Sequence, residues 1–463
     1  MRSIYMKYFF LLMLMCIMSG CTKFVTLDPP QTDLITSSVF SSDQTATATI
    51  IGVYTNMMSI AEPGFYGGSF TLYGGLSSDE FQNYSFSKDQ SEFAANSIKP
   101  TNGFLRQLWS EPYQYIYTAN AIIEGLAKSH GVSPGIKSEL LGEARFIRAI
   151  SYFYLVNLWG DVPLALQSAY TVNDTLHRTA SSEIYRQIIL DLTDAQTLLL
   201  PDYSVGRGER IRPNQSAATA LLARVLLYNH DWQGAVNQST AVITNSSLYT
   251  LLPDLNQVFL ANSQEAIWQL QPVTPSYNSF EGNIFILTSG PFSSTASITL
   301  STQLLNSFEP GDLRKSNWTN ADTTNGGEYY YPFKYKVKSS NTVTEYQMVL
   351  RVAEQYLIRA EAEAHLQNIP EAITDLNIIR ERAGLPDLPS NLTEDQCLAA
   401  VAQERRIELF AEWGHRWLDL KKTMQATPVL APIKTGWQAT DTLYPIPQSE
   451  IQNDPNLTQN PGY

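Results

Sequence analysis

The sequence predicts a mainly α-helical fold in which pairs of helices form a scaffold and a second, irregular part carries long loops. Two observations predict this fold. Apolar residues recur at three- and four-residue steps through several long segments, which is the spacing of an amphipathic helix. Residues 65–93 and 275–335 instead gather aromatic residues among Gly, Ser, Asn and Asp without a sustained helical period, so we expect long loops with short strands there.

The first predicted helices lie in the N-terminal half. Residues 107–127 and 181–199 both show helical periodicity. Between them, Ser138 is expected to cap a helix whose apolar positions recur as far as Leu158. Gly160 is expected to end this helix, because glycine readily adopts the backbone conformation that follows a last helical turn.

Two later helices begin at recognisable capping residues. Asn214 is expected to cap one of them, since its side chain can accept a hydrogen bond from the first helical turn. Thr393 and Gln396 have the spacing of a capping box, which predicts a helix that runs to about Glu412.

A weak internal repeat indicates how the helices pair. Ala223 and Ala235 have the same spacing as Ala360 and Ala372, and helical periodicity lies on either side of each pair. Small residues at this spacing let two antiparallel helices approach closely, as in tetratricopeptide repeats. Because only two copies are found, far apart in the chain, we expect scattered helix pairs and not a regular solenoid.

The N-terminus has the pattern of an export signal. Arg2 and Lys7 precede a short apolar run, residues 8–18, which is too short to span a bilayer. Residues 1–20 therefore read as a cleavable signal peptide. Because Ser19 and Gly20 directly precede Cys21, the site resembles a lipobox, and Cys21 is expected to be diacylated, with palmitate among the acyl chains. The alternative is an ordinary secretory signal with a cysteine there by chance.

Charge and cysteine content narrow the function further. The net charge of −13 argues against nucleic-acid binding and against attachment to anionic lipid through basic residues. No stretch after Cys21 approaches the length of a membrane span, so contact with the membrane is expected only through the lipid anchor. With Cys16 removed and Cys21 acylated, Cys397 has no disulfide partner and is expected to be a buried, inert thiol.

Sequence signatures of enzymes are absent. The chain has no nucleophile elbow, phosphate-binding loop or zinc-protease motif, its five histidines lack ligand spacing, and we expect no metal and no cofactor. Glu404 and Glu408 could be taken for an acid/base pair of the kind that glycosidases use. Four residues apart on one helix face, they better suit ion pairs with the neighbouring arginines. The same structural role is expected for Glu143, Arg145, Glu361 and Arg380.

Five sequence strings, taken in order, resemble one family, the SusD/RagB outer-membrane lipoproteins of Bacteroidetes. They are W-x3-Y-x2-I-x3-N at 109–120, GEARFIRA at 142–149 continuing to GDVPL at 160–164, RAEA at 359–362 followed by LN-x2-R-x-RAG at 376–384, ERR-x-EL at 404–409 with RW-x-DL at 416–420, and YPIP-x2-EI at 444–451 with a terminal QNPGY. Together they extend over nearly the whole mature chain.

The resemblance implies a tetratricopeptide-like helix scaffold joined to a loop-rich half that binds the ligand. It implies an N-terminal region, residues 21–230, and a C-terminal region, residues 231–463, that form one compact unit. It also implies an oligosaccharide ligand, an outward-facing position on the outer membrane, and a partner, a SusC-like TonB-dependent barrel over which such proteins sit as a lid. Members are not known as catalysts.

The resemblance places ligand residues in the loops before Trp109 and in the irregular middle third of the chain, which are the two aromatic stretches. No family string covers them, so candidates are chosen by composition: an exposed aromatic ring can cover the C–H face of a sugar while nearby polar groups bind its hydroxyls. Trp318, within a polar run, and Tyr84, beside Asn83, fit this description best. The full set of candidates is Tyr73, Asp79, Tyr84, Asn96, Tyr277, Trp318 and Tyr331.

Three other functions remain open at the sequence level. The same fold could bind peptides, since aromatic loops serve both ligands. A glycoside hydrolase would need a pair of carboxylates that no motif identifies. A lid without ligand affinity of its own could act only by closing the barrel.

Overall fold

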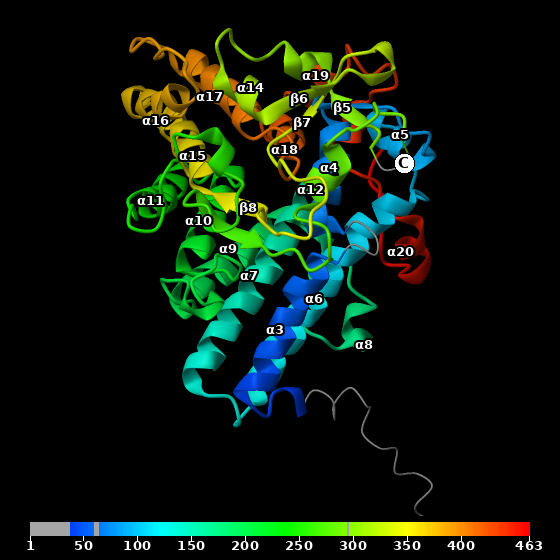
Figure 1. The fold of residues 1–463 in the computed structure, drawn as a ribbon. Helices are drawn as coiled ribbons and strands as arrows, with labels where there is room; N and C mark the ends of the chain where they lie inside the picture. Colours follow the sequence, from blue (N-terminus) through cyan, green and yellow to red (C-terminus); the bar gives the residue numbers. More distant parts are fainter. Residues whose placement is uncertain (1–37, 60–63, 294–295) are drawn as a thin grey trace, which may run out of the picture.

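A computed structural model gives the fold, and it describes residues 38–59, 64–293 and 296–463. The signal peptide and Cys21 lie outside the described residues. The fold is mainly helical, with a few short strands, as the sequence predicts (Figure 1).

The α-helices of the described chain range in length from 4 to 26 residues. They are α3 Asp43–Met57, α4 Phe70–Ser77, α5 Lys88–Ala94, α6 Gly103–Lys128, α7 Pro134–Trp159, α8 Tyr170–Asn173, α9 Ser181–Leu198, α10 Gln215–Tyr228, α11 Trp232–Ile243, α12 Phe280–Phe285, α13 Thr302–Leu305, α14 Leu313–Trp318, α15 Val352–His365, α16 Ile369–Arg382, α17 Glu394–Glu408, α18 His415–Lys422, α19 Ala426–Leu430 and α20 Gln448–Asn453. A π-helical turn, η2 Phe65–Ser69, precedes α4, and the 3₁₀ turns are η3 Ser204–Gly206, η4 Leu255–Gln257, η5 Thr324–Gly326 and η6 Ala439–Thr442.

The strands of the described chain form four antiparallel pairs. These are β1 (Phe81–Asn83) with β5 (Ile298–Leu300), β2 (Val162–Pro163) with β3 (Arg178–Thr179), β4 (Ala266–Leu270) with β8 (Gln347–Arg351), and β6 (Thr319–Asp322) with β7 (Tyr329–Pro332). Each pair is too small to be stable alone, so the helices must support them.

The long helices form a curved stack. Each of α7, α9, α10, α11, α15, α16 and α17 packs against the next in that order, along the left side of Figure 1. The repeat found in the sequence lies inside this stack: α10 pairs with α11 and α15 with α16, and Ala223, Ala235, Ala360 and Ala372 are all fully buried. The prediction of close helix pairs is confirmed, since these alanines leave room for the partner backbone.

Most predicted helix ends are confirmed. Gly160 follows α7 with a φ of 74°, and the Asn214 side chain accepts a hydrogen bond from the Ala217 amide at the start of α10. Thr393 and Gln396 form the capping box of α17. Two expectations were wrong, and they concern Ser138 and Glu412.

Both errors have a physical cause. Ser138 lies inside α7, which starts earlier at Pro134, and its hydroxyl donates to the Leu198 carbonyl instead of capping. The helix α17 ends at Glu408 and not at Glu412, because the chain turns sharply there, with positive φ at Ala411, Trp413 and Gly414. The periodicity continued past the turn only because the apolar residues of the turn are also buried.

The first aromatic stretch, residues 65–93, is more helical than predicted, since it holds η2, α4 and most of α5. The rings of Phe65, Tyr66, Phe70 and Tyr73 are all buried. A helix that is apolar on every side shows no amphipathic period, which is why the pattern was missed. The second stretch, residues 275–335, has short helices, short strands and loops, close to the expectation.

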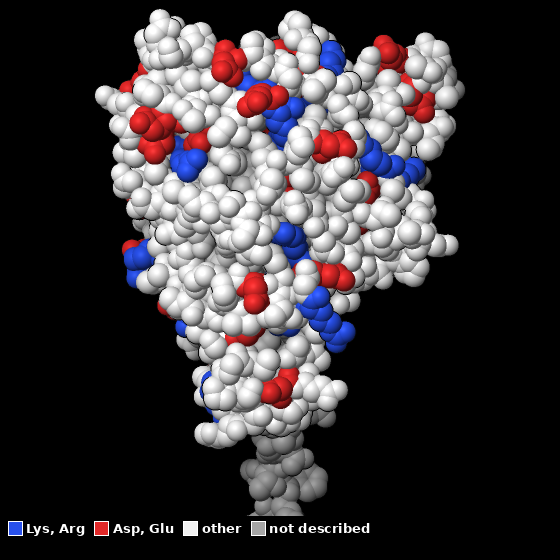
Figure 2. All heavy atoms as spheres, turned by 60° about the vertical axis from the view of Figure 1, so that its left-hand side comes forward, with Lys and Arg blue, Asp and Glu red and all other residues white. Residues whose placement is uncertain are grey.

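The main core extends over the chain from Phe40 to Leu457. Helices of the stack and elements of the irregular half both contribute to it, so the strand pairs are held on a rigid base. Within the described residues, no helix has the length and apolar composition needed to cross a bilayer. Figure 2 shows one face of the molecule, on which acidic and basic side chains are scattered in small groups among uncharged residues.

Candidate functional site

Three aromatic rings from separate segments meet at the surface of the irregular half. The ring centroids of Tyr84 and Phe292 lie 5.7 Å apart, those of Tyr84 and Tyr329 5.8 Å, and those of Phe292 and Tyr329 5.4 Å. Each pair meets nearly at right angles, the edge-to-face arrangement that aromatic rings favour. We call Tyr84, Phe292 and Tyr329 the aromatic triad.

Two strand pairs position the triad. The Tyr84 amide donates to the Ser297 carbonyl at 2.8 Å, which extends the β1–β5 ladder by one residue and fixes the tyrosine beside it. Tyr329 opens β7 and lies opposite Asp322 of β6. It packs against a small apolar cluster formed by Ile286, Leu287, Ala296 and Tyr331.

The triad is accessible. Phe292 is 52% exposed, while Tyr84 and Tyr329 are half-buried. Phe86, two residues after Tyr84, is 98% exposed. Large apolar rings this exposed are unfavourable in water, so such a group marks a surface that meets something else.

Polar groups surround the rings. Burial and the neighbouring Tyr329 raise the pKa of Tyr84, so its hydroxyl stays neutral and can both donate and accept. Hydrogen bonds from Thr324 lower the pKa of Asp322, opposite Tyr329, so this side chain stays a carboxylate, but it is buried. Asn320, two residues before Asp322 on β6, is exposed. Aromatic faces with acceptors and donors beside them suit a ligand that has C–H faces and a rim of hydroxyls.

The remaining residues chosen from the sequence do not gather around the triad. Tyr331 is the nearest of them, on the same strand as Tyr329, but it is buried. Tyr277 is partly exposed and precedes α12. No contact in the described residues joins Tyr277 to the triad rings.

Three candidates in or just after the first aromatic stretch are internal, which contradicts their choice as accessible ligand contacts. Tyr73 is 1% exposed and packs its ring 4.6 Å from Phe93. Asn96 is buried and accepts a hydrogen bond from Lys434 at 2.5 Å. Asp79 is buried in ion pairs with two arginines. Each was chosen for its polar or aromatic type, which does not reveal burial.

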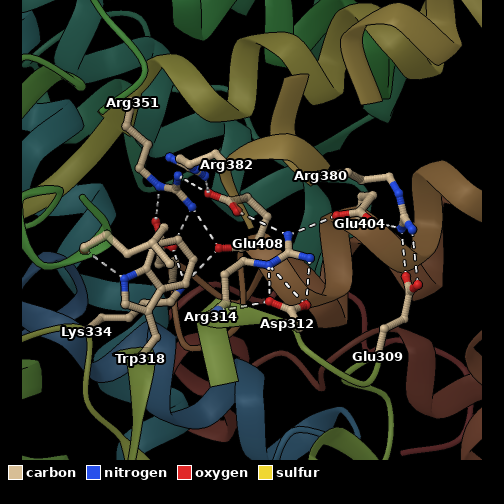
Figure 3. Close-up of polar contacts among 12 residues, drawn as sticks. Glu309, Asp312, Arg314, Trp318, Lys334, Arg351, Arg380, Arg382, Glu404 and Glu408 are labelled. Atoms are coloured by element: carbon tan, nitrogen blue, oxygen red, sulfur yellow. Dashed lines mark hydrogen bonds and ion pairs between the residues drawn. The ribbon is translucent and has the colours of Figure 1, made fainter. Parts of the chain in front are cut away.

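The expectation for Trp318 was also wrong. Its side chain is fully buried, its indole nitrogen donates to the Leu255 carbonyl at 3.0 Å, and the Lys334 ammonium lies 4.6 Å from its ring centroid (Figure 3). The polar run around it misled the prediction because Ser316 and Asn320 are exposed, whereas the indole of Trp318, at the end of α14, is buried.

Glu404 and Glu408 lie in the buried ionic network shown in Figure 3. Glu408 binds Arg351 at 2.6 Å, Arg314 at 3.3 Å and Arg382, and Glu404 binds Arg314 at 2.9 Å. Their structural role is confirmed, although the partners come from α14, β8 and α16 and not from adjacent arginines as expected. A carboxylate enclosed in this way cannot reach a glycosidic bond.

The other charged positions assigned a structural role also form ion pairs. Glu143 pairs with Arg212, Arg145 with Asp191 and Asp194, Glu361 with Lys422, and Arg380 with Glu309 and Glu404. Among the described residues, no group of three His, Cys, Asp or Glu side chains could hold a metal ion.

Phe292 and Tyr329 were present in the second aromatic stretch but were not chosen, and Phe86 was passed over in the first. Composition could not single them out, because an exposed ring and a buried one look alike in sequence. For two of them the neighbours were a usable signal, because Phe292 lies between Pro and Ser and Phe86 between two serines, whereas Tyr329 begins an aromatic run and had no such signal.

Two family models match the two ends of this chain. A model described as "Starch-binding associating with outer membrane" matches residues 31–227, and a model described as "SusD family" matches residues 303–463. The chain belongs to the SusD-like family. The resemblance predicted from the five sequence strings is thereby confirmed.

Known SusD-like proteins match over nearly the full length. SusD-like protein P2 of Formosa agariphila is 26% identical, with 99% of each chain aligned. A SusD superfamily protein of Bacteroides vulgatus has a structure with a TM-score of 0.81 at 21% identity, covering 92% of this chain and 100% of that one. A laminarin-binding SusD-like protein has a TM-score of 0.75 at 24% identity, covering 91% and 100%. At these identities the structural matches establish the shared fold.

Proposed function

We propose that this SusD-like protein binds oligosaccharides at the aromatic triad and passes them to a SusC-like TonB-dependent transporter. The observation that carries the proposal is the group of accessible rings, Tyr84, Phe292 and Tyr329, with Phe86 close by in sequence. A protein of the same fold that binds laminarin supports a glycan as the ligand.

The chemistry of the triad favours a sugar. A pyranose has C–H groups on its faces, which would remove Phe292 from water, and hydroxyls that the Tyr84 hydroxyl can bind. Each well-packed aromatic contact is worth about 1 kcal/mol beyond the area it buries. Two strand pairs hold Tyr84 and Tyr329, so little ordering cost is incurred at these two rings when the ligand binds.

Binding is tested by calorimetry on a form that begins at residue 22, which keeps the whole main core because that core begins at Phe40. The panel includes starch and laminarin oligosaccharides. We expect Phe292→Ala and Phe86→Ala to weaken binding about tenfold each. Tyr170→Ala is the matched control, because Tyr170 is 72% exposed on α8 and has no part in the triad.

The outcomes separate the alternatives. If no glycan binds but a peptide pool does, and Phe292→Ala abolishes that binding, the ligand is a peptide. Release of reducing ends by the pure protein would make it a hydrolase. If nothing binds, and import by cells is normal with the triad replaced by alanines, the protein acts as a lid alone. A loss in Tyr170→Ala equal to that in Phe292→Ala would refute the site.

The proposal includes a diacylated Cys21 that holds the protein on the outer face of the outer membrane. The Ser19-Gly20-Cys21 sequence supports the anchor, and the description of the matched N-terminal model, association with the outer membrane, supports the location. Cys21→Ser should shift the protein from the membrane to the soluble fraction and abolish palmitate labelling. Protease added to whole cells should cleave the wild-type protein, whereas an inward-facing protein would be protected.

A further inference from the structure

A second concavity lies between α17 and the α18–α19 segment, and no residue of the aromatic triad lines it. Its volume is about 650 Å³, within the range of about 300–1,000 Å³ that is usual for small-molecule sites. The turn before α11 and the last turn of α15 also contribute to its lining. We call it the α17–α18 pocket.

One wall of the α17–α18 pocket is apolar. Met424 follows α18 and lines this pocket, and its side chain is 84% exposed. Its φ of +57° is uncommon for a residue other than glycine, and in this conformation the apolar side chain lies in solvent. Trp232 also lines the pocket, stacked on His365 with ring centroids 4.0 Å apart. The aliphatic lining side chains are Leu398, Val401, Ala402, Leu420, Met424 and Val429.

The charged lining has an excess of cations. Four basic side chains line the pocket, whereas only two carboxylates, Glu361 and Asp419, do so. This excess is local, because the whole chain has a net charge of −13. The basic residues are Arg405, Arg406, Arg416 and Lys422.

The inner pair, Arg405 and Lys422, is neutralised. Arg405 binds Asp419 at 2.8 Å, and Lys422 binds Glu361 at 2.6 Å. These two cations therefore meet two carboxylates, so the excess charge must come from the other two arginines.

Arg406 and Arg416 share a single carboxylate. Asp79 accepts from Arg406 at 2.7 Å and from Arg416 at 2.7 and 3.1 Å. The Arg406 Nε is buried without a hydrogen-bond acceptor among the described residues. Burial lowers the pKa of Arg406, and the adjacent Arg416 lowers it further, although Asp79 and, more weakly, Glu80 oppose this shift. Both side chains retain some exposure, 16% and 12%.

A neighbouring carboxyl group does not supply the missing charge. Burial raises the pKa of Glu80, the residue after Asp79, to about 8, so Glu80 is mostly protonated at neutral pH. Among the described residues, Asp79 is the one carboxylate that forms an ion pair with Arg406 or with Arg416, so one positive charge of this pair has no paired counter-ion. A guanidinium group binds carboxylates in a planar, two-point geometry, which makes a carboxylate the natural complement.

From this geometry we infer that the α17–α18 pocket binds a small monocarboxylate that has an apolar body. The carboxylate would take the accessible edges of Arg406 and Arg416, and the body would lie along the wall formed by Leu398, Val401 and Met424. A single negative charge fits the single uncompensated positive charge. A dianion such as phosphate fits less well, because the free energy needed to remove its hydration in a mostly apolar pocket exceeds the attraction gained from one unpaired positive charge.

The test uses N-acetylphenylalanine and its neutral amide as a matched pair of probes, with binding measured by saturation-transfer NMR and calorimetry on the form that begins at residue 22. We expect the acid to bind saturably and at least about tenfold more tightly than the amide. Arg406→Met should remove that preference while glycan binding at the triad stays unchanged. Absence of saturable binding by the acid, or equal affinity for acid and amide, would overturn the inference.

A pair of variants that cannot disturb the fold completes the test. Met424 is exposed, so Met424→Glu and Met424→Lys should both unfold at the temperature of the wild type. Because they place opposite charges at the pocket, Glu should weaken binding of the acid and Lys should strengthen it, each by several-fold. If both variants bind the acid as the wild type does, the carboxylate is not held in this pocket.

Discussion

Replacing Glu408 by glutamine tests whether the buried ionic network holds the fold together. Glu408 is fully buried and accepts charged hydrogen bonds from Arg314, Arg351 and Arg382, which come from α14, β8 and α16. Burial alone would raise the pKa of Glu408, but these guanidinium groups hold it well below its ordinary value. The carboxylate is therefore charged at neutral pH.

The expected loss follows from the cost of unpaired buried charge. Glutamine keeps the shape of the side chain but leaves three guanidinium groups with one negative charge fewer. Removing one partner of a buried ion pair costs about 3–5 kcal/mol of unfolding free energy. Because Glu408 has three arginine partners, we expect Glu408→Gln to cost an amount at the upper end of this range. A chain of this size unfolds with an entropy of about 0.9 kcal/mol/K, so the midpoint temperature should fall by about 4–5 °C.

The assay is thermal unfolding followed by calorimetry and circular dichroism, with Glu183→Gln as the control. Glu183 pairs with Arg186 on an exposed face of α9, where a salt bridge contributes at most about 1 kcal/mol. The loss in unfolding free energy caused by Glu408→Gln should be constant near neutral pH. This loss should become smaller below about pH 4.3, because Glu408 in the unfolded wild-type chain becomes protonated there. A deficit no larger than that of Glu183→Gln would refute the role of the network.

Three further predictions concern other buried groups. Burial raises the pKa of Glu281 to about 8, so the stability that this residue contributes is greatest below the ordinary carboxyl pKa and is lost as pH rises through 8. The unfolding free energy of the wild type should therefore fall between pH 5 and 9, and Glu281→Gln should reduce this fall by up to about 1.4 kcal/mol per pH unit. An unchanged slope would contradict this. Trp318→Phe should lower the free energy of unfolding by about 1–3 kcal/mol in denaturant titrations, because the Leu255 hydrogen bond and the Lys334 contact are lost. The glycan affinity should stay that of the wild type. A specific loss of glycan affinity would instead show that Trp318 contacts the ligand. Cys397 is buried and its thiol pKa is raised by that burial, so a thiol reagent should modify it only in denaturant, and rapid labelling of the native protein would contradict its position.

Local signals in the sequence predicted the scaffold well. Gly160, Asn214 and the Thr393–Gln396 capping box act within one or two turns of chain, so their effect is visible in a few adjacent residues. The alanine repeat was also informative, because the close approach of two helices requires small side chains at fixed positions.

The binding surface was predicted only in part, because burial is decided by distant residues. Tyr84 and Tyr73 come from the same aromatic stretch, yet Tyr84 joins Phe292 at the surface while Tyr73 packs under Phe93. The polar neighbours of Tyr84 favoured it, but the rings that cover or expose each tyrosine are not adjacent to it in sequence. Trp318 shows the same limit, since the side chains that enclose it come from residues 255–259 and 334.

The stack of helices is continuous in space although it is interrupted in the chain. Helices α11 and α15 pack directly together, and Arg359 of α15 donates to Thr240 of α11 at 3.2 Å, yet residues 244–351 lie between them in sequence and carry most of the triad. During folding, the face of α11 that α15 covers must therefore stay uncovered until that whole segment has been synthesised. Residues 244–351 are thus a long excursion from a stack of helices that is unbroken in space, and Arg314 and Arg351 of this excursion tie it back to α17.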